Sequence, residues 1–337
     1  MTFFMAGHSF SVRCFPPDRN SIAKMVSKNL DSEVIKMKEF EFSSLGGGTL
    51  HGYRWEPAGE PVAVVQIIHG IAEHMLRYDE FARFLNAHGV LVVAEDHMGH
   101  GKSEGTRLYF SGGWETAAED CYTLLTRTHE EFPQLPYFLF GHSMGSFLTR
   151  TILIRHPDAP LAGAVICGTG WQPAAVLAAG RSLCAEEKLR VGETGHSKLL
   201  TSLMFGAYNN KFKPVRTPND WICTDPEVVD RYTADPLCGG DATVGLAREL
   251  IRGIGFIQKR SNLEKMNPKL PVLFIAGQSD PVGSMGEGVK KTARHFREAG
   301  VEKIYLHLYP GRHEILNEPN RADVFVDIWK FLSKSIK

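Results

Sequence analysis

Residues 137–145 read YFLFGHSMG, and this stretch indicates both a fold and a chemistry. A short aromatic and aliphatic run, typical of a buried strand, leads directly into Gly141, Ser143 and Gly145. The pattern G-x-S-x-G between a strand and a helix forms a nucleophile elbow, a tight turn in which glycines are needed because Cβ atoms do not fit. The sequence therefore predicts that Ser143 is a nucleophile and that a helix runs from Met144 to about Arg155.

Strand-like segments lie on both sides of this elbow. The first two are separated by the turn LGGG and resemble antiparallel strands, whereas the later ones alternate with helical segments. Near-continuous apolar strands between helices are typical of a parallel sheet that is covered on both faces. The predicted fold class is α/β, with a mostly parallel, doubly wound sheet of about eight strands. The predicted strands are residues 38–42, 49–55, 62–69, 90–96, 137–140, 161–168, 271–277 and 303–309.

The domain organisation follows from two segments that break this alternation. Residues 1–35 show no clear period, and we expect a poorly ordered extension; Met25 or Met37 could be the true start. About a hundred residues separate the strands at 161–168 and 271–277, far more than the usual connection. We expect residues 171–238 to form an inserted helical cap, and residues 36–170 and 239–337 to form the core.

One helical stripe in the insertion allows two interpretations. The segment SKLLTSLMFGAY places apolar side chains at helical spacing, so that they would share one face. That face packs on the core, or lines or gates an acyl pocket; in a lid both can be true. The residues concerned are Leu199, Leu200, Leu203, Met204 and Ala207.

Composition narrows the function classes. Lysine plus arginine and aspartate plus glutamate both number 38, so no positive field attracts nucleic acid or an anionic membrane. Six cysteines occur without metal-like spacing, which favours reduced thiols in a reducing compartment. No segment approaches the roughly 20 apolar residues that span a bilayer. We expect a soluble, cytoplasmic protein that acts on a small molecule.

A serine nucleophile needs a base and an acid that orients the base. Asp280 follows the strand at 271–277, and His313 follows the strand at 303–309; this gives the order serine, acid, histidine. Asp280 could instead be a turn residue before Pro281. The backbone N–H groups of Met144 and of Ile71, in the loop after the third strand, are the expected oxyanion donors.

Four other histidines offer a rival interpretation as a metal site. They gather near strand ends, but their loops lack the ligand spacing usual for zinc. We therefore expect no metal site at these histidines. These residues are His69, His97, His100 and His142.

Five motifs together resemble the monoacylglycerol lipase and lysophospholipase branch of the α/β-hydrolase superfamily, over roughly residues 36–337. The insertion stretch NDWICTDPEVVDRYTADPLCGG also looks like bacterial, lysophospholipase-like members. The five motifs are HGIAEHMLRY (69–78), EDHMGHGKSEG (95–105), GHSMGS (141–146), QSDPVG (278–283) and YPGRHEILNE (309–318).

The resemblance implies a helical cap over an apolar acyl channel, no cofactor, and hydrolysis of monoacylglycerol or lysophospholipid esters through an acyl-enzyme. By motif, the catalytic triad is Ser143, Asp280 and His313, and the oxyanion hole is formed by Ile71 and Met144. Where the family often has a small residue and a glycine after HG, this chain has Ile71 and Ala72. The bulkier side chain keeps the donor but is expected to narrow the site.

Asp96, in the EDH turn, also matches a feature of the family, and we assign it a structural turn role. An exposed apolar face on the cap would suggest transient contact with lipid surfaces. The sequence does not fix the oligomeric state.

Two alternative functions remain open on fold analogy. The first is a proline-type aminopeptidase, which needs a cap carboxylate for the substrate amine; Glu186, Glu187 and Glu193 are available in a charged run. The second is a small-molecule receptor that keeps the triad without turnover.

Overall fold

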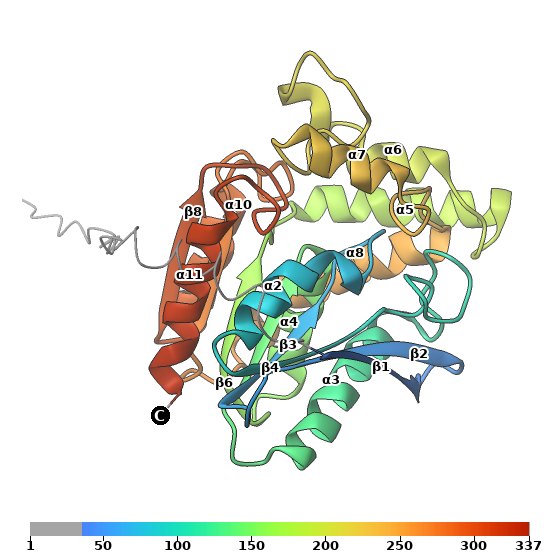
Figure 1. Cartoon of the computed structure of the whole chain (residues 1–337). Helices are drawn as coiled ribbons and strands as arrows, with labels where there is room; N and C mark the ends of the chain where they lie inside the picture. The colour runs from blue at the N-terminus through green and yellow to red at the C-terminus, as the bar shows by residue number, and fades with distance from the viewer. Residues whose placement is uncertain (1–35, 337) are drawn as a thin grey trace, which may run out of the picture. The chain divides into compact units, whose positions relative to one another are not determined.

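The computed structural model describes residues 36–336, which form an eight-stranded sheet flanked by helices (Figure 1). The predicted extension, residues 1–35, lies outside the described residues. The predicted α/β class is confirmed, and each predicted strand is present within a few residues of its expected bounds. The strands are β1 (Lys36–Ser43), β2 (Thr49–Glu56), β3 (Ala63–Ile68), β4 (Val90–Glu95), β5 (Tyr137–His142), β6 (Leu161–Cys167), β7 (Val272–Gly277) and β8 (Ile304–Tyr309).

The strand order in the sheet is β1-β2-β4-β3-β5-β6-β7-β8. β1 pairs antiparallel with β2, as the LGGG turn suggested, and β2 also pairs antiparallel with β4. All remaining pairs are parallel. Parallel strands bring their carboxyl ends to one edge of the sheet, so the loops after β3, β5, β7 and β8 gather there.

Helices cover the sheet and fill the long insertion. Outside the insertion they are η1 (Met75–Tyr78), α2 (Asp79–Asn86), α3 (Gly113–Glu131), α4 (Met144–Arg155), α10 (Glu287–Glu298), α11 (Arg321–Leu332) and η3 (Ser333–Ser335). Between β6 and β7 they are α5 (Ala174–Val191), α6 (Lys198–Phe205), η2 (Tyr208–Lys211), α7 (Pro226–Ala234), α8 (Val244–Gln258) and α9 (Arg260–Leu263).

β5 shows how the sheet is buried on both faces. Its residues alternate between the two faces of the sheet. Phe140 contacts Phe81 of α2, with ring centroids 5.2 Å apart, whereas Leu139 belongs to the core cluster that includes side chains of α3 and α4. Every residue of β5 is buried, which explains why its sequence is apolar without alternation.

The insertion divides into two parts by packing. α8 packs against α3 and α4 and against α5, so it belongs to the layer that covers the sheet. Figure 1 shows α5, α6 and α7 grouped together at the top of the view. Capping residues set the helix starts: Ser197 accepts from the Leu200 N–H, and Asp225 precedes Pro226 as the N-cap of α7.

α6 contains four of the five residues of the predicted stripe, all but Ala207, and these four do not share one environment. Leu200 is buried beside residues of α5 and α8, and Met204 packs against the same cluster. Leu199 and Leu203 are exposed. The stripe therefore divides: its buried part packs on the core, as one of the expected alternatives has it, whereas Leu199 and Leu203 lie on an exposed face.

Two further observations concern the described residues alone. None of their helices combines the length and the apolar character that a membrane span requires. The cysteines among them are free thiols, and all are buried.

Candidate active site

The turn between β5 and α4 has the geometry of a nucleophile elbow. Ser143 adopts φ 53° and ψ −120°, a region that non-glycine residues rarely occupy. A Cβ on Gly145 would lie 2.0 Å from the Ile68 carbonyl oxygen, and one on Gly141 would lie 2.4 Å from the Gly145 oxygen. Both glycines are therefore required for β3, β5 and α4 to approach this closely, and the strain at Ser143 is held by their packing.

His313 and Asp280 meet at the same edge of the sheet. His313 Nδ1 lies 3.0 Å from Asp280 Oδ1, and both side chains are buried. The same carboxylate oxygen accepts the Val282 N–H at 2.9 Å, which fixes the carboxylate plane. This arrangement orients the imidazole and leaves its Nε2 directed away from Asp280.

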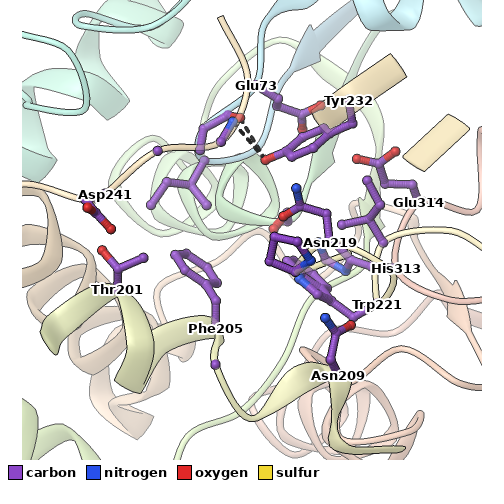
Figure 2. A pocket seen from close by; sticks show the side chains of 18 of the residues that line it. Glu73, Thr201, Phe205, Asn209, Asn219, Trp221, Tyr232, Asp241, His313 and Glu314 are labelled. Carbon is purple, nitrogen blue, oxygen red and sulfur yellow. Dashed lines mark hydrogen bonds between the residues drawn. The ribbon is translucent and has the colours of Figure 1, made fainter. Parts of the chain in front are cut away.

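Ser143 and His313 line one pocket of about 430 Å³ (Figure 2). Within residues 36–336 no hydrogen bond joins the Ser143 hydroxyl to the His313 imidazole. Such contacts are often loose before substrate binds. The chemistry available to the site is that of an activated hydroxyl beside an oriented imidazole.

The loop after β3 approaches the nucleophile closely. A Cβ on Gly70 would lie 3.0 Å from the Ser143 Cβ and 2.5 Å from a Glu73 carboxylate oxygen, so only glycine fits there. Ile71 lines the pocket, and Met144 follows Ser143 as the first residue of α4. Among the described residues no acceptor takes the Ile71 N–H, which leaves this donor free.

A buried ion network connects this loop to His313, and the sequence reasoning missed it. Arg77 Nη1 donates to Glu73 Oε2 at 2.6 Å and to Glu314 Oε1 at 2.7 Å, while Nη2 donates to Glu314 Oε2 at 2.6 Å. Glu314 directly follows His313. The Arg77 guanidinium also stacks on the Tyr232 ring, 4.8 Å from its centroid. Glu73 and Glu314 belong to the motifs HGIAEHMLRY and YPGRHEILNE, but the motifs alone do not predict that Arg77 binds both carboxylates.

Glu73 also binds His142, which precedes the nucleophile. His142 Nδ1 lies 3.2 Å from Glu73 Oε1, and His142 Nε2 lies 3.3 Å from the His313 carbonyl oxygen. Burial disfavours the charged forms of His142 and Glu73. The hydrogen bond to Glu73 and the negative charge of Glu73 nevertheless raise the pKa of His142. In return, His142 and Arg77 lower the pKa of Glu73 well below its ordinary value despite burial. The contact with Glu73 therefore favours the protonated form of His142.

The insertion forms the rest of the pocket wall. The Trp221 ring lies beside the His313 imidazole, with the two ring centroids 5.1 Å apart. The Tyr232 hydroxyl donates to the Ala72 carbonyl at 2.9 Å, which attaches the insertion to the loop after β3. The lining mixes polar with apolar groups. Residues 201–241 contribute Thr201, Ser202, Phe205, Gly206, Asn209, Pro218, Asn219, Trp221, Ile222, Tyr232, Gly239, Gly240 and Asp241.

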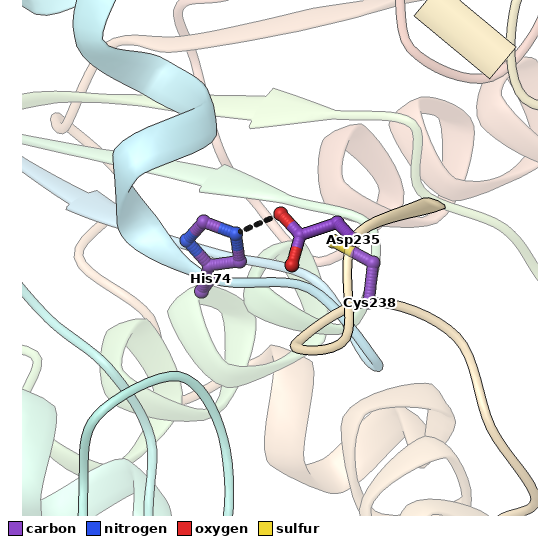
Figure 3. A group of neighbouring side chains, drawn as sticks. All are labelled: His74, Asp235 and Cys238. Carbon is purple, nitrogen blue, oxygen red and sulfur yellow. Dashed lines mark hydrogen bonds and ion pairs between the residues drawn. The ribbon is translucent and has the colours of Figure 1, made fainter. Parts of the chain in front are cut away.

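A second attachment lies between the same loop and the end of α7. His74 Nε2 lies 2.8 Å from Asp235 Oδ2, and the Cys238 side chain lies beside them (Figure 3). This pair and the Tyr232 hydroxyl hold the carboxyl-terminal end of the insertion against residues 72–74.

Other residues singled out in the sequence lie away from the pocket. Glu187 pairs with Arg190, and Glu193 pairs with Lys188; neither these two glutamates nor Glu186 lines the pocket.

The remaining residues singled out in the sequence have structural contacts. Asp96 accepts hydrogen bonds from the Tyr53 hydroxyl and from the Met75 and Lys102 N–H groups, which is a structural turn role. Among the described residues, His69, His97, His100 and His142 do not together form a group that could hold a metal.

Comparison with known proteins gives one consistent result. The model of the family described as serine aminopeptidase, S33 matches residues 59–320. The monoacylglycerol lipase of Mycolicibacterium smegmatis is 31% identical over 302 residues, which cover 87% of this chain and 96% of that protein. Human monoglyceride lipase is 31% identical over 83% of this chain and 85% of its own length.

Solved structures agree with these relatives. A lipase structure in its open form superposes with a TM-score of 0.82 at 31% identity, covering 90% of this chain and all of that one. A thermostable carboxyl esterase from Bacillus coagulans, in complex with glycerol, gives a TM-score of 0.80 at 30% identity with the same coverage.

Proposed function

Since the chain belongs to the serine aminopeptidase S33 family of α/β-hydrolases, we propose that it hydrolyses monoacylglycerols or lysophospholipids through Ser143, His313 and Asp280. The chain is a carboxylic ester hydrolase, and its similarity to lipases and esterases supports a lipid-like ester as substrate. The observation that carries the catalytic assignment is the contact between His313 Nδ1 and Asp280 Oδ1, 3.0 Å long, beside a strained Ser143 in one pocket.

In the proposed mechanism, His313 Nε2 removes the Ser143 hydroxyl proton while the oxygen attacks the ester carbonyl carbon. Asp280 stabilises the imidazolium that forms. The imidazolium then gives its proton to the alcohol oxygen as the C–O bond breaks, which releases the alcohol and leaves an acyl-serine. Water repeats the sequence, transferring its proton to His313, and releases the carboxylic acid.

The backbone N–H groups of Ile71 and Met144 would stabilise the oxyanion of each tetrahedral intermediate. The free Ile71 N–H beside Ser143 and the position of Met144 at the N-terminus of α4 support this assignment. The Ile71 side chain lines the pocket and would restrict the space around the carbonyl group.

We propose that residues 171–238 act as a lid. Its attachments to Ala72 and His74 and its share of the pocket wall support this role. Leu199 and Leu203 of α6 are 47% and 63% exposed, which supports transient contact of the lid with a lipid surface.

The test is steady-state hydrolysis of p-nitrophenyl esters from acetate to palmitate, monoacylglycerol, lysophosphatidylcholine and proline p-nitroanilide. We expect ester turnover by the wild type, and a loss of about 10⁴-fold or more in Ser143→Ala with an unchanged circular dichroism spectrum. Ser182→Ala, on the exposed part of α5, is the matched control and should retain full activity.

Three outcomes would contradict the proposal. Ester turnover that survives in Ser143→Ala would remove the assigned nucleophile. Cleavage of proline p-nitroanilide without ester cleavage would indicate an aminopeptidase. A single acylation without turnover would indicate a receptor.

A further inference from the structure

The wall of the pocket carries one carboxylate that no cation neutralises. The described residues that line the pocket include three carboxylates, those of Glu73, Asp241 and Glu314, and neither lysine nor arginine. Arg77 binds both Glu73 and Glu314. The half-buried carboxylate of Asp241, in contrast, takes part in no hydrogen bond or ion pair in the described part of the chain. One negative charge in the pocket therefore remains without a partner.

Backbone contacts to α6 fix the chain around Asp241. The Ala242 N–H donates to Thr201 Oγ1 at 3.0 Å, and the Ala242 carbonyl oxygen accepts from the Ser197 N–H at 3.0 Å. Figure 2 accordingly shows Asp241 beside Thr201. A carboxylate that is held in this way keeps the fixed position that specific recognition needs.

This part of the wall offers hydrogen-bond acceptors and lacks free donors. Thr201 Oγ1 donates its hydrogen to the Ser197 carbonyl oxygen at 2.9 Å, so the hydroxyl does not donate to Asp241. Arg107, which lies near this segment, donates to two backbone carbonyl oxygens instead. A protonated amine carries a positive charge and three N–H donors, and it therefore matches these acceptors in both charge and hydrogen bonding.

The position of Asp241 relative to His313 indicates which part of an ester would reach it. In the proposed mechanism His313 gives its proton to the leaving alcohol, so the alcohol lies on the His313 side of the ester carbonyl. In Figure 2, Asp241 and Thr201 lie on one side of the pocket, whereas His313 and Glu314 lie on the opposite side. The acyl part of a bound ester would therefore extend toward Asp241.

We propose that Asp241 recognises a protonated amine on the acyl part of the substrate, so that the enzyme hydrolyses esters of amino-terminated acyl chains besides lipid-like esters. This inference rests on the proposed function, because it concerns the same pocket. The ammonium group takes no part in the covalent steps, which remain those of ester hydrolysis. A plain alkyl chain beside Asp241 would remove water from the carboxylate without replacing its hydrogen bonds, whereas an ammonium group replaces them.

The sequence suggested other carboxylates of the insertion for binding an amine. These were Glu186, Glu187 and Glu193, and none of them lines the pocket. Glu186 is exposed, so it provides a matched control that removes the same charge from outside the pocket.

The test uses p-nitrophenyl esters of ω-aminohexanoate and ω-aminooctanoate beside their methyl-terminated isosteres, heptanoate and nonanoate. We expect the ratio of kcat/KM for an amino ester to kcat/KM for its isostere to fall at least about tenfold in Asp241→Asn, which keeps the size of the side chain and removes its charge. A general loss of activity lowers both values and cancels in the ratio. Glu186→Gln should leave the ratio unchanged.

Equal ratios in the wild type and in Asp241→Asn would overturn the inference. A ratio that falls in Glu186→Gln but not in Asp241→Asn would also overturn it, because recognition would then lie outside the pocket. Turnover of the methyl-terminated esters tests the ester hydrolase assignment separately, since those esters carry no amine.

Binding of octylammonium tests the same contact without any turnover. Isothermal titration calorimetry should give a dissociation constant at least about tenfold lower for the wild type than for Asp241→Asn, and equal values for the wild type and Glu186→Gln. Equal binding by the wild type and Asp241→Asn would overturn the inference even if no ester were cleaved.

Discussion

Helices α4 and α5 are both rich in apolar residues, but they are buried to very different extents. Eleven of the twelve residues of α4 are buried, whereas only Leu177, Cys184 and Glu187 of the 18 residues of α5 are buried. An apolar sequence therefore does not by itself show how deeply a helix is buried, because that depends on the elements packed around it. α4 is enclosed by the sheet and by α3 and α8, while much of α5 faces solvent.

The same contrast extends to charges. The ion pairs beside the elbow are buried and share partners, while those of the insertion are mostly exposed and pairwise. A region with few buried contacts opens at a lower free energy than the core, which suits a lid. The catalytic groups, in contrast, need fixed positions.

The largest expected effect separates these two kinds of ion pair. Arg77→Met leaves Glu73 and Glu314 buried without their cation and should lower the free energy of unfolding by about 3–5 kcal/mol. The matched variant Arg216→Met removes an exposed pair with Asp230 and should cost less than about 1 kcal/mol. Urea denaturation of both variants measures the difference. Equal losses would show that the buried network does not distinguish the two regions.

A smaller effect follows from the pKa shifts of Glu73 and His142. The pKa of His142 is raised, so its contribution is present below pH 6.5 and is lost as pH rises through the folded-state value. The pKa of Glu73 is lowered, so its contribution is present above pH 4.5 and is lost as pH falls through the folded-state value. The pair should therefore stabilise the fold most between pH 4.5 and 6.5.

His142→Gln tests this window. The difference in unfolding free energy from the wild type should be about 1.5–3 kcal/mol inside the window, as for hydrogen bonds to charged groups, and should shrink as pH rises through the raised pKa of His142. His196→Gln in the insertion is the control, because His196 is exposed and should give no such maximum. A difference that does not change with pH would mean that His142 is not charged in the folded state.

The strands and the elbow could be predicted from the sequence because their signals are local. An apolar run and two glycines suffice to place Ser143, and the bounds predicted for α4 agree with the structure. The link from Glu73 through Arg77 to Glu314 could not be predicted, because Arg77 and Glu314 are 237 positions apart and many other carboxylates could have paired with Arg77. The alternatives for the stripe on α6 could not be decided for a related reason: periodicity shows an apolar face but not which of its residues a neighbouring element covers.

The smallest expected effect on stability comes from that uncovered face. Leu199 and Leu203 lie on the exposed side of α6, while Thr201 and Phe205 of the same helix line the pocket. Replacing both leucines by serine removes no buried contact, so the free energy of unfolding should change by less than about 0.5 kcal/mol. Hydrolysis of a water-soluble p-nitrophenyl ester should also be unchanged, because neither side chain reaches the pocket.

Activity on aggregated substrate should respond differently. Partial burial of each leucine in a lipid surface would contribute about 1 kcal/mol, so the double variant should hydrolyse monoacylglycerol in vesicles about 30-fold more slowly at low lipid concentration. Leu45→Ser is the control, since Leu45 is 66% exposed but lies in the turn between β1 and β2, outside the insertion. Equal vesicle activity in all three proteins would mean that the exposed face of α6 takes no part in lipid contact, and that its apolar residues are tolerated there without a function.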